Sequence, residues 1–292
     1  MTTIDDLPLY RTTRVGGLTV HAIEAGLQRL DGGAMFGVVP KPLWEKRIGA
    51  DERNRIPLAM RCLLVEAPNA LLLIDTGAGN KESEKFASIY GLENAGSPTR
   101  LEDGIRAAGH APEDIDIVLS THLHFDHAGG NTVRTEEGQV VPAFPNAEYV
   151  VQRREFDFAH SLNERIRASY LGPNFDPIPE SRWRLLEGPE QVTDGVRVEL
   201  TPGHTPFHQS VFIEDAGDTA LFLADVCPTS AHLPLPWIMG YDLEPLVTLE
   251  SKRGLWERAR AESWQLVFEH DPVVPWGRLD ADDPRPALIT ED

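Results

Sequence analysis

The sequence predicts an α/β protein built from layered sheets, and three observations support that prediction. Short apolar runs rich in β-branched residues alternate with segments of helical periodicity along the 292 residues. No linker, fixed-period repeat or low-complexity tract interrupts this alternation. Residues of the kind that bind metals follow several apolar runs directly, which is where open α/β sheets hold their ligands. We therefore expect one domain over residues 1–292, with peripheral tails at 1–17 and 280–292.

The expected strands are the short apolar runs, and they lie at 62–65, 71–74, 115–120, 196–200, 220–224 and 264–268. Residues 111–114 are expected to form a turn or helix entry, because a proline and two acids come early there. Helical spacing of polar and apolar residues predicts helices over 151–170 and 244–262. Residues 81–101 are expected to be loop-rich and to join the early strands to the first helix. The segment 151–170 is placed to form a lid or a substrate wall.

The most informative feature is a run of metal ligands at His122, His124, Asp126 and His127. Imidazole and carboxylate groups suit zinc and similar ions. Positions 122 and 124 alternate, so in an extended segment both side chains point the same way and can bind one ion. Asp126 and His127 follow after the chain has begun to turn, so they can reach a second ion. The run therefore predicts a site divided between two metals.

Two metals need more than four ligands, and the rest must come from distant parts of the chain. Candidates follow other expected strands, and they are Asp75, His204, Asp225 and His270. We expect these residues to converge on one edge of a layered sheet.

The His-x-His-x-Asp-His run, followed by a later Gly-His, a later Asp and a final His, resembles the metallo-β-lactamase superfamily. The likeness extends from about residue 18 to residue 270. It implies a four-layer αββα sandwich with a dinuclear metal site at one edge of the two sheets. It also implies a first metal bound by His122, His124 and His204, a second bound by Asp126, His127 and His270, and Asp225 as the bridge. Asp75 and His208 would support these ligands without binding a metal. These ligands accept zinc, manganese, cobalt or iron, and we expect zinc.

Residues 31–44 resemble the entry segment of a lactonase-like branch, which includes quorum-quenching acyl-homoserine lactonases and methyl-parathion-hydrolase-like enzymes. This implies an enzyme that opens a lactone or carboxylic ester, most readily of the acyl-homoserine-lactone type, through a hydroxide that bridges the metals. Asp126 would orient the hydroxide and pass its proton to the leaving group. The better-known lactonases carry a tyrosine three positions after the bridging aspartate, where this chain has Pro228. Tyr170 and Tyr241 are the candidates to replace it.

Apolar side chains near the expected site predict a substrate pocket. The residues expected to line it are Met35, Phe36, Trp44, Phe125, Tyr170, Phe207 and Trp237. Packing in the core is the commoner role for each of them taken singly. For Phe207 the two roles are evenly balanced, because it lies close to His204 and could narrow the pocket.

Several other functions are compatible with parts of this pattern. The leading alternative is a phosphotriesterase, because the same dinuclear centre can attack phosphorus. A thioesterase resembling glyoxalase II would need a basic cluster for glutathione, which we do not find. Flavodiiron proteins resemble the chain but carry Glu in place of His124 and add a flavin domain. A non-catalytic scaffold would be expected to have lost ligands.

The charge balance and the lack of apolar spans limit the possible partners. The chain has 27 lysines and arginines against 46 acids, which disfavours nucleic acid as a substrate. No stretch approaches the roughly 20 apolar residues of a membrane span, and the amino terminus lacks the features of a signal peptide. We expect a cytoplasmic protein with a small-molecule substrate and two reduced thiols, Cys62 and Cys227. A homodimer is plausible, with the apolar stretch at 36–44 as its contact.

Overall fold

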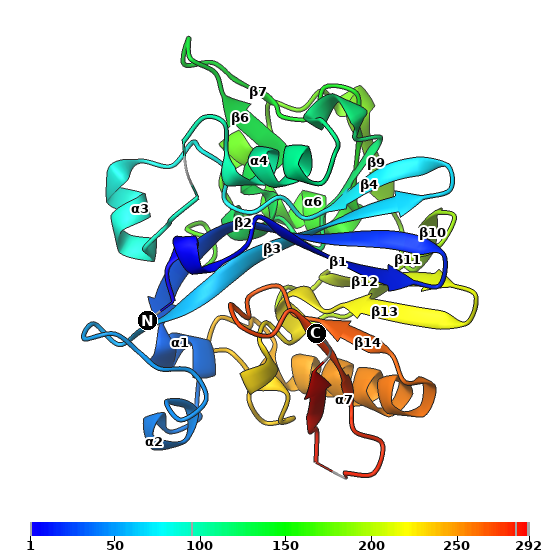
Figure 1. Cartoon of the computed structure of the whole chain (residues 1–292). Coiled ribbons are helices and arrows are strands. Elements are labelled where there is room, and N and C mark those ends of the chain that lie inside the picture. Colours follow the sequence, from blue (N-terminus) through cyan, green and yellow to red (C-terminus); the bar gives the residue numbers. More distant parts are fainter. Residues whose placement is uncertain (1, 95, 284, 291–292) are drawn as a thin grey trace.

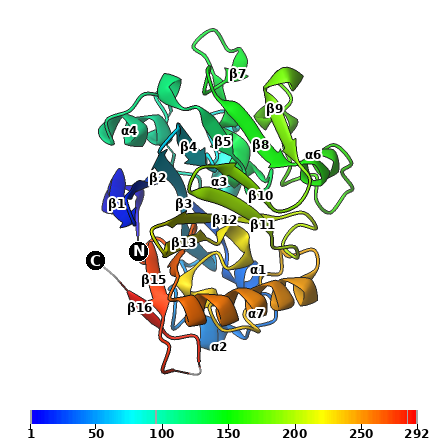
Figure 2. The same ribbon diagram turned by 90° about the vertical axis from the view of Figure 1, so that its right-hand side faces the viewer.

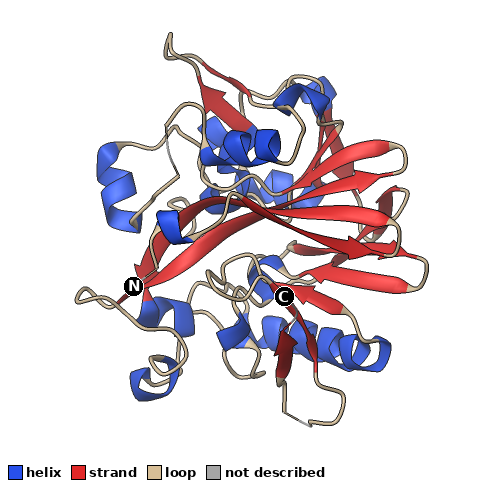
Figure 3. Ribbon diagram, in the orientation of Figure 1, coloured by secondary structure: helices blue, strands red, loops and turns tan. Residues whose placement is uncertain are grey.

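Two seven-stranded sheets lie face to face in the computed structural model, which describes residues 2–94, 96–283 and 285–290. Helices cover the outer face of each sheet (Figure 1 and Figure 2). Coloured by secondary structure, the strands form the centre of the molecule and the helices lie at its periphery (Figure 3). The predicted four-layer αββα arrangement is confirmed.

The first sheet begins as an antiparallel meander and ends with parallel strands. β1 to β4 pair antiparallel in chain order, and β5, β8 and β9 then add parallel to β4. Its strands are β1 (Tyr10–Val15), β2 (Leu18–Asp31), β3 (Arg55–Ala67), β4 (Ala70–Ile74), β5 (Ile117–Leu119), β8 (Glu148–Gln152) and β9 (Trp183–Leu186).

The second sheet is antiparallel except where β13 pairs with β14. A parallel pair needs a crossover, and helix α7 (Pro245–Glu262) lies in that connection. The strands are β10 (Glu190–Thr193), β11 (Val196–Leu200), β12 (Gln209–Asp215), β13 (Asp218–Phe222), β14 (Gln265–Val267), β15 (Trp276–Leu279) and β16 (Leu288–Thr290). A separate ribbon pairs β6 (Thr132–Arg134) with β7 (Val140–Pro142).

The remaining helices are short. The α-helices are α1 (Gly32–Phe36), α2 (Lys41–Trp44), α3 (Glu84–Tyr90), α4 (Arg100–Ala107), α5 (Phe125–Ala128) and α6 (Arg153–Ala159). The 3-10 turns are η1 (Ile4–Asp6), η2 (Pro112–Asp114), η3 (Gly129–Asn131), η4 (Gly172–Asn174), η5 (Glu180–Arg182), η6 (Ala224–Val226) and η7 (Ser230–His232). Among the described residues, no helix combines the length and the apolar character needed to cross a membrane.

The largest apolar cluster joins the inner faces of the two sheets. Val20 and Leu63 from the first sheet belong to it together with Val211 and Phe222 from the second. Alternate residues of the same strands face outward, where α4 covers the first sheet and α7 covers the second. Because each sheet is buried on both faces, its strands consist of nearly continuous apolar runs.

The structure corrects three expectations about elements. Residues 151–170 are not one helix, because 148–152 pair with neighbouring strands as β8 and only Arg153–Ala159 are helical. The segment 81–101 contains helix α3 as well as loops. Residues 10–15 are not a peripheral tail, since β1 pairs along its whole length with β2 and buries Val15. In the other expected tail, residues 288–290 pair with β15, whereas residues 1, 284 and 291–292 lie outside the described residues. That the chain is one domain stays a prediction.

Candidate dinuclear metal centre

Loops from both sheets bring the predicted ligands to one edge of the sandwich. His122 and His124 follow β5, and the one-turn helix α5 carries Asp126 and His127. The others come from the second sheet, and they are His204 after β11, Asp225 in η6 after β13, and His270 after β14.

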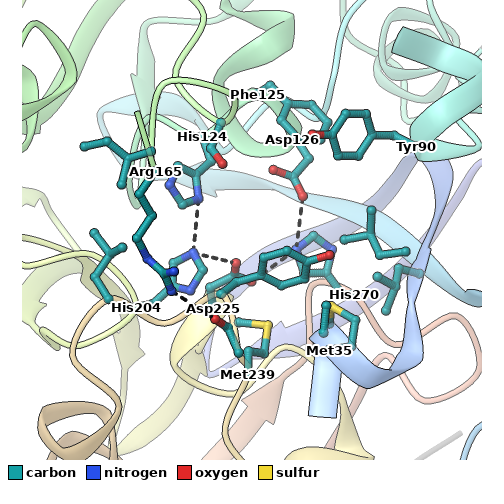
Figure 4. A pocket seen from close by; sticks show the side chains of 18 residues that line it. Met35, Tyr90, His124, Phe125, Asp126, Arg165, His204, Asp225, Met239 and His270 are labelled. Carbon is teal, nitrogen blue, oxygen red and sulfur yellow. Dashed lines mark hydrogen bonds and ion pairs between the residues drawn. The ribbon is translucent and has the colours of Figure 1, made fainter. Parts of the chain in front are cut away.

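The seven side chains form two adjoining groups. The candidate ligand atoms of His122, His124, His204 and Asp225 all lie within 4.8 Å of one another, and so do those of Asp126, His127 and His270. Asp225 lies between the groups, with Oδ2 3.0 Å from His204 Nε2 and Oδ1 3.1 Å from His270 Nε2. Figure 4 shows this arrangement, with His124 and His204 on one side of Asp225 and Asp126 and His270 on the other.

The first pair of imidazoles is oriented through Asp75. His122 Nδ1 lies 3.1 Å from Thr121 Oγ1, which donates its own proton to Asp75 Oδ2 at 2.7 Å. His127 Nδ1 lies 3.1 Å from Asp75 and 3.0 Å from Glu269. Since a carboxylate only accepts hydrogen bonds, Nδ1 of His127 carries the proton. Both rings therefore direct an Nε2 lone pair into the site.

The second pair is oriented by one acceptor in a loop, Asp242, and one in strand β3, Ala59. His204 Nδ1 donates to Asp242 Oδ1 at 3.0 Å, and His270 Nδ1 donates to the Ala59 carbonyl at 2.6 Å. Nδ1–H donation to carboxylates or carbonyls is the usual arrangement of metal-binding histidines, because it leaves Nε2 free for the ion.

The resulting donor set fits divalent cations. His204 Nε2 faces His124 Nδ1 at 3.1 Å, and His270 Nε2 faces His127 Nε2 at 3.3 Å. Among the described side chains, the buried His122 Nε2 has no hydrogen-bond partner. Lone pairs that face each other are repulsive unless a proton or a cation lies between them. These separations match the roughly 3.4 Å between ligands that bind one tetrahedral ion through bonds of about 2.1 Å.

The electrostatics of the site also favour positive charge. Burial opposes ionisation, yet Asp225 raises the pKa of His204 to about 10 and that of His270 to about 9. Burial and the neighbouring imidazoles lower the pKa values of His122 and His124 far below the ordinary histidine value. These two rings are therefore neutral, as metal ligands must be.

Backbone contacts explain the two glycines that follow the ligand run. A Cβ on Gly129 would collide with the backbone of Ala78, and one on Gly130 would collide with the Thr76 carbonyl. The loop after β4 therefore packs directly against the chain that carries Asp126 and His127. Asp75 and Ala224, each beside a ligand loop, adopt positive φ values of 53° and 45°. Non-glycine residues rarely adopt this region, and those that do are concentrated at functional sites.

Six residues hold the candidate ligands in place. The sequence suggested two of them, Asp75 and His208, and did not suggest the other four. Asp75 acts as described above, and His208 Nε2 accepts the Asp225 N–H at 3.3 Å. The additional residues are Gln28, Glu155, Asp242 and Glu269. Gln28 is fully buried in β2 and donates to Asp126 Oδ2 at 2.5 Å. A polar residue within a long apolar strand is the sequence feature that could have drawn attention to Gln28. Its partner could not be found in this way, because Asp126 lies 98 positions further along the chain.

Glu155 links the two ligand loops of the first metal group. This buried carboxylate accepts the Leu123 N–H at 3.2 Å, the Tyr170 hydroxyl at 2.8 Å and the Thr205 hydroxyl at 2.9 Å. Leu123 precedes His124 and Thr205 follows His204, so Glu155 fixes both loops at once. In the sequence, Glu155 is only one of the polar positions within the expected helix at 151–170.

A cavity of about 330 Å³ opens onto the two metal groups. Its walls are mostly apolar, and the apolar residues are Leu30, Ala34, Met35, Leu58, Phe125, Ile166, Met239 and Leu243. The polar groups outside the metal ligands are Tyr90, Arg165, Ser169 and Tyr241. Figure 4 shows Tyr90 beside Asp126 and Arg165 reaching toward His204.

Two of the seven expected pocket residues, Met35 and Phe125, line this cavity. The expectation is wrong for the other five, which are packed elsewhere. Phe36 and Trp44 are buried and stacked on each other, and Trp237 packs edge-on against Phe36. Tyr170 lies behind His124 with its hydroxyl bound to Glu155. Phe207 contacts Phe158 and the Arg154 guanidinium instead of entering the cavity.

Of the two tyrosines suggested to replace the one missing at 228, only Tyr241 reaches the cavity. Pro228 itself supports a ligand, because its carbonyl accepts the His270 N–H at 2.9 Å. Both cysteines are free and buried.

Comparison with known proteins identifies the family. The profile of the metallo-beta-lactamase superfamily matches residues 57–275. The chain belongs to the metallo-beta-lactamase superfamily. An N-acyl homoserine lactonase from Bacillus thuringiensis is 31% identical over 224 residues, which are 73% of this chain and 82% of the relative. The superfamily member described here is therefore a hydrolase.

Solved structures agree with this placement. A probable metal-dependent hydrolase from Staphylococcus aureus superimposes with a TM-score of 0.87 at 31% identity, covering 96% of this chain and 99% of that one. AidC, a dizinc quorum-quenching lactonase, shares the fold with a TM-score of 0.80 at 20% identity and 99% coverage of both chains. The family and the donor set together support a centre for divalent metal ions.

Proposed function

We propose that this hydrolase is a dinuclear zinc lactonase that opens the ring of N-acyl homoserine lactones. The observation that carries the proposal is that the two groups of candidate metal ligands border a largely apolar cavity. The ring carbonyl would lie between the metal groups, and the acyl chain would lie along Leu30, Leu58 and Met239. The lactonase relatives at about 30% identity support this substrate class.

In the proposed site, His122, His124 and His204 would hold one ion, and Asp126, His127 and His270 would hold the other. Asp225, whose two oxygens face both groups, would contribute to each of them. When bound, two divalent ions supply a water that is acidic enough to act as a nucleophile at neutral pH, and they polarise the carbonyl. The side chains of the protein itself would orient the substrate and carry the proton from the nucleophile to the leaving group.

Asp126 is the proposed proton carrier. Gln28 holds its Oδ2, so the carboxylate has one fixed orientation toward the space between the metal groups. It accepts a proton as the nucleophile attacks and returns it to the ring oxygen when the C–O bond breaks. The product is an open hydroxy acid.

Tyr90 and Tyr241 are the phenols available to hold the substrate. Burial raises the pKa of Tyr241 to about 12, and burial together with the Asp126 charge raises that of Tyr90. Both hydroxyls therefore stay protonated at neutral pH and can donate to a carbonyl oxygen. We assign to them the contact that a tyrosine at position 228 would otherwise make.

Arg165 is the cation that lines the cavity, and we propose that it binds the amide carbonyl of the substrate. Its guanidinium donates to the Gly240 carbonyl at 3.4 Å. Within the described part of the chain, no carboxylate forms an ion pair with it. Its remaining N–H groups are therefore free for a ligand.

A substrate panel tests the proposal. After reconstitution with zinc, we expect kcat/KM for acyl-homoserine lactones to exceed that for paraoxon-type phosphotriesters by at least about 100-fold, a difference of roughly 2.7 kcal/mol in transition-state binding. Measuring kcat/KM for acyl-homoserine lactones of increasing chain length shows how much of the apolar wall the acyl chain contacts. A phosphotriester preference would replace this proposal with organophosphate hydrolysis by the same centre.

We also propose that the protein forms a homodimer through the segment 36–44. Phe36 and Trp44 are buried within the chain and do not form this contact, but Val38 and Leu43 are 94% and 51% exposed. Analytical ultracentrifugation of the Val38→Asp variant tests this, and a monomeric wild-type chain would refute it.

A further inference from the structure

Three potential ligands meet on the outer face of the first sheet, away from the dinuclear centre. They are His21 from β2, Glu66 from β3 and His110 from the loop after α4. Their nearest ligand atoms all lie within 4.8 Å of one another. None of the three lines the catalytic cavity or contacts a residue of the dinuclear site.

Strand register explains how the first two residues meet. His21 lies opposite Leu64, and Glu66 lies opposite Thr19. Because paired residues share a face and the side-chain period of a strand is two, His21 and Glu66 point to the same side of the sheet. That side is the one covered by α4.

Helix α4 delivers the third residue. A Cβ on Gly104 would collide with the Ile23 side chain, so the helix lies directly against β2. After the helix, Gly109 takes a positive φ of 98°, and the His110 N–H returns to the Ile105 carbonyl at 3.1 Å. This glycine cap turns the chain back toward the sheet and places the His110 ring over Glu66.

The distances suit one ion. His21 Nε2 lies 3.4 Å and His110 Nε2 3.1 Å from Glu66 Oε1, close to the roughly 3.4 Å between ligands of a tetrahedral ion. His21 Nδ1 is held by Thr12 Oγ1 at 2.9 Å, which fixes the ring with Nε2 toward the site. Two imidazoles and a carboxylate are a donor set that zinc adopts with water as the fourth ligand.

Access and surroundings favour exchange with solvent. The His21 side chain is 9% exposed, whereas those of His110 and Glu66 are 24% and 42% exposed. One ligand is thus held rigidly in the sheet, and the other two face water. An ion could enter from solvent and keep water in its open position.

We propose that His21, Glu66 and His110 form a third, exchangeable zinc site that fastens the end of α4 to the outer face of the first sheet. Glu66 lies seven residues along β3 from Ala59, which contacts His270. At about 3.3 Å per residue, the two sites are roughly 23 Å apart along the strand. Zinc at this site therefore acts on stability and leaves the reaction centre unchanged.

Zinc binding to the reconstituted dinuclear enzyme tests the proposal. Calorimetric titration and metal analysis at controlled free zinc should show a third equivalent for the wild type. His110→Ala and Glu66→Gln should bind two equivalents and retain wild-type turnover. The third equivalent should raise the melting temperature of the wild type and leave that of His110→Ala unchanged.

His160→Ala is the matched control, because His160 is also an exposed histidine paired with a carboxylate, Asp176, at 3.1 Å. This variant should keep the third equivalent. The proposal is overturned if the wild type binds only two ions up to about 0.1 mM free zinc. It is equally overturned if His110→Ala binds the third ion as tightly as the wild type, which would make that ion adventitious. The zinc-binding measurements do not depend on substrate turnover, so they test this proposal even if the protein does not hydrolyse lactones.

Discussion

At the scale of single residues, the geometry of the candidate centre depends on side chains outside the proposed ligand set. Each orienting acceptor, such as Asp242 or the Ala59 carbonyl, fixes one imidazole. Gln28 does the same for Asp126, but it uses a neutral donor. A neutral amide donor fixes the orientation of the Asp126 carboxylate without forming an ion pair with it.

Replacing Gln28 with leucine should therefore reduce kcat more than it changes KM. We expect a loss of about 10–100-fold, typical for removal of a group that orients a ligand. The steady-state constants of Gln28→Leu measure this split, and Gln139→Leu, at an exposed hairpin position, is the matched control. A variant with wild-type kcat would show that Asp126 is positioned without Gln28.

His232 predicts a pH dependence of stability. Burial lowers the pKa of this ring to about 3, while its Nε2 donates to the Met35 carbonyl at 2.9 Å. Between about pH 6.5 and 3 the unfolded chain binds a proton that the folded chain excludes. Stability is therefore present above pH 6.5 and is lost as the pH falls, by up to about 1.4 kcal/mol per pH unit.

Urea unfolding of the wild type and His232→Gln at pH 7 and pH 5 measures this effect. We expect a smaller loss of unfolding free energy in the variant over that interval, whatever its stability at pH 7. Loss of metal at low pH affects both proteins alike and cancels in the comparison. Equal losses would mean that His232 is protonated in the folded chain.

At the scale of elements, periodicity located the strands well because both sheets are buried on both faces. Residues 196–200 form β11 with the predicted bounds, and the expected helix at 244–262 differs from α7 by one residue. The error at 151–170 has a tertiary cause. Asn163 Oδ1 accepts the backbone N–H groups of Arg165 and Ile166, and the Ser169 carbonyl accepts that of Phe125. These contacts hold the segment as an irregular wall of the pocket, which no local pattern indicates.

This wall makes Arg165 a binding residue in the proposed function. Arg165→Met should raise KM for acyl-homoserine lactones by about 10-fold, because one charge-assisted hydrogen bond contributes roughly 1.5 kcal/mol, and should leave kcat nearly unchanged. Simple lactones without the amide should be hydrolysed equally well by both proteins. Arg167→Met, two residues away on the exposed side of the segment, is the control, and an equal loss on simple lactones would contradict the assignment.

At the scale of the whole molecule, the order of the candidate ligands along the chain predicted the architecture through its resemblance to a known superfamily. The pocket could not be predicted in the same way. Whether an aromatic side chain such as Phe36 or Phe207 faces the cavity depends on packing between distant loops, and here both pack elsewhere. The sequence singled out the candidate metal ligands because their chemistry is rare, and it missed the pocket walls because apolar residues are common.

Metal removal should destabilise the entire chain, since the ligand loops belong to both sheets. Without cations, the converging lone pairs and the Asp225 carboxylate repel one another or take up protons. We expect the melting temperature to fall by roughly 5–10 °C after chelation, as for a ligand present at about 100 times its dissociation constant. Differential scanning calorimetry of the chelated protein, before and after zinc is restored, measures this change. An unchanged melting temperature would show that metal binding does not contribute to the stability of the fold.

The apolar cavity also has a consequence for hydration. At about 30 Å³ per molecule of liquid water, 330 Å³ corresponds to on the order of ten waters. An acyl chain that enters this space returns those waters to bulk solvent. Such binding is marked by a negative heat-capacity change, so the binding enthalpy of long-chain ligands should fall with temperature more steeply than that of short-chain ones.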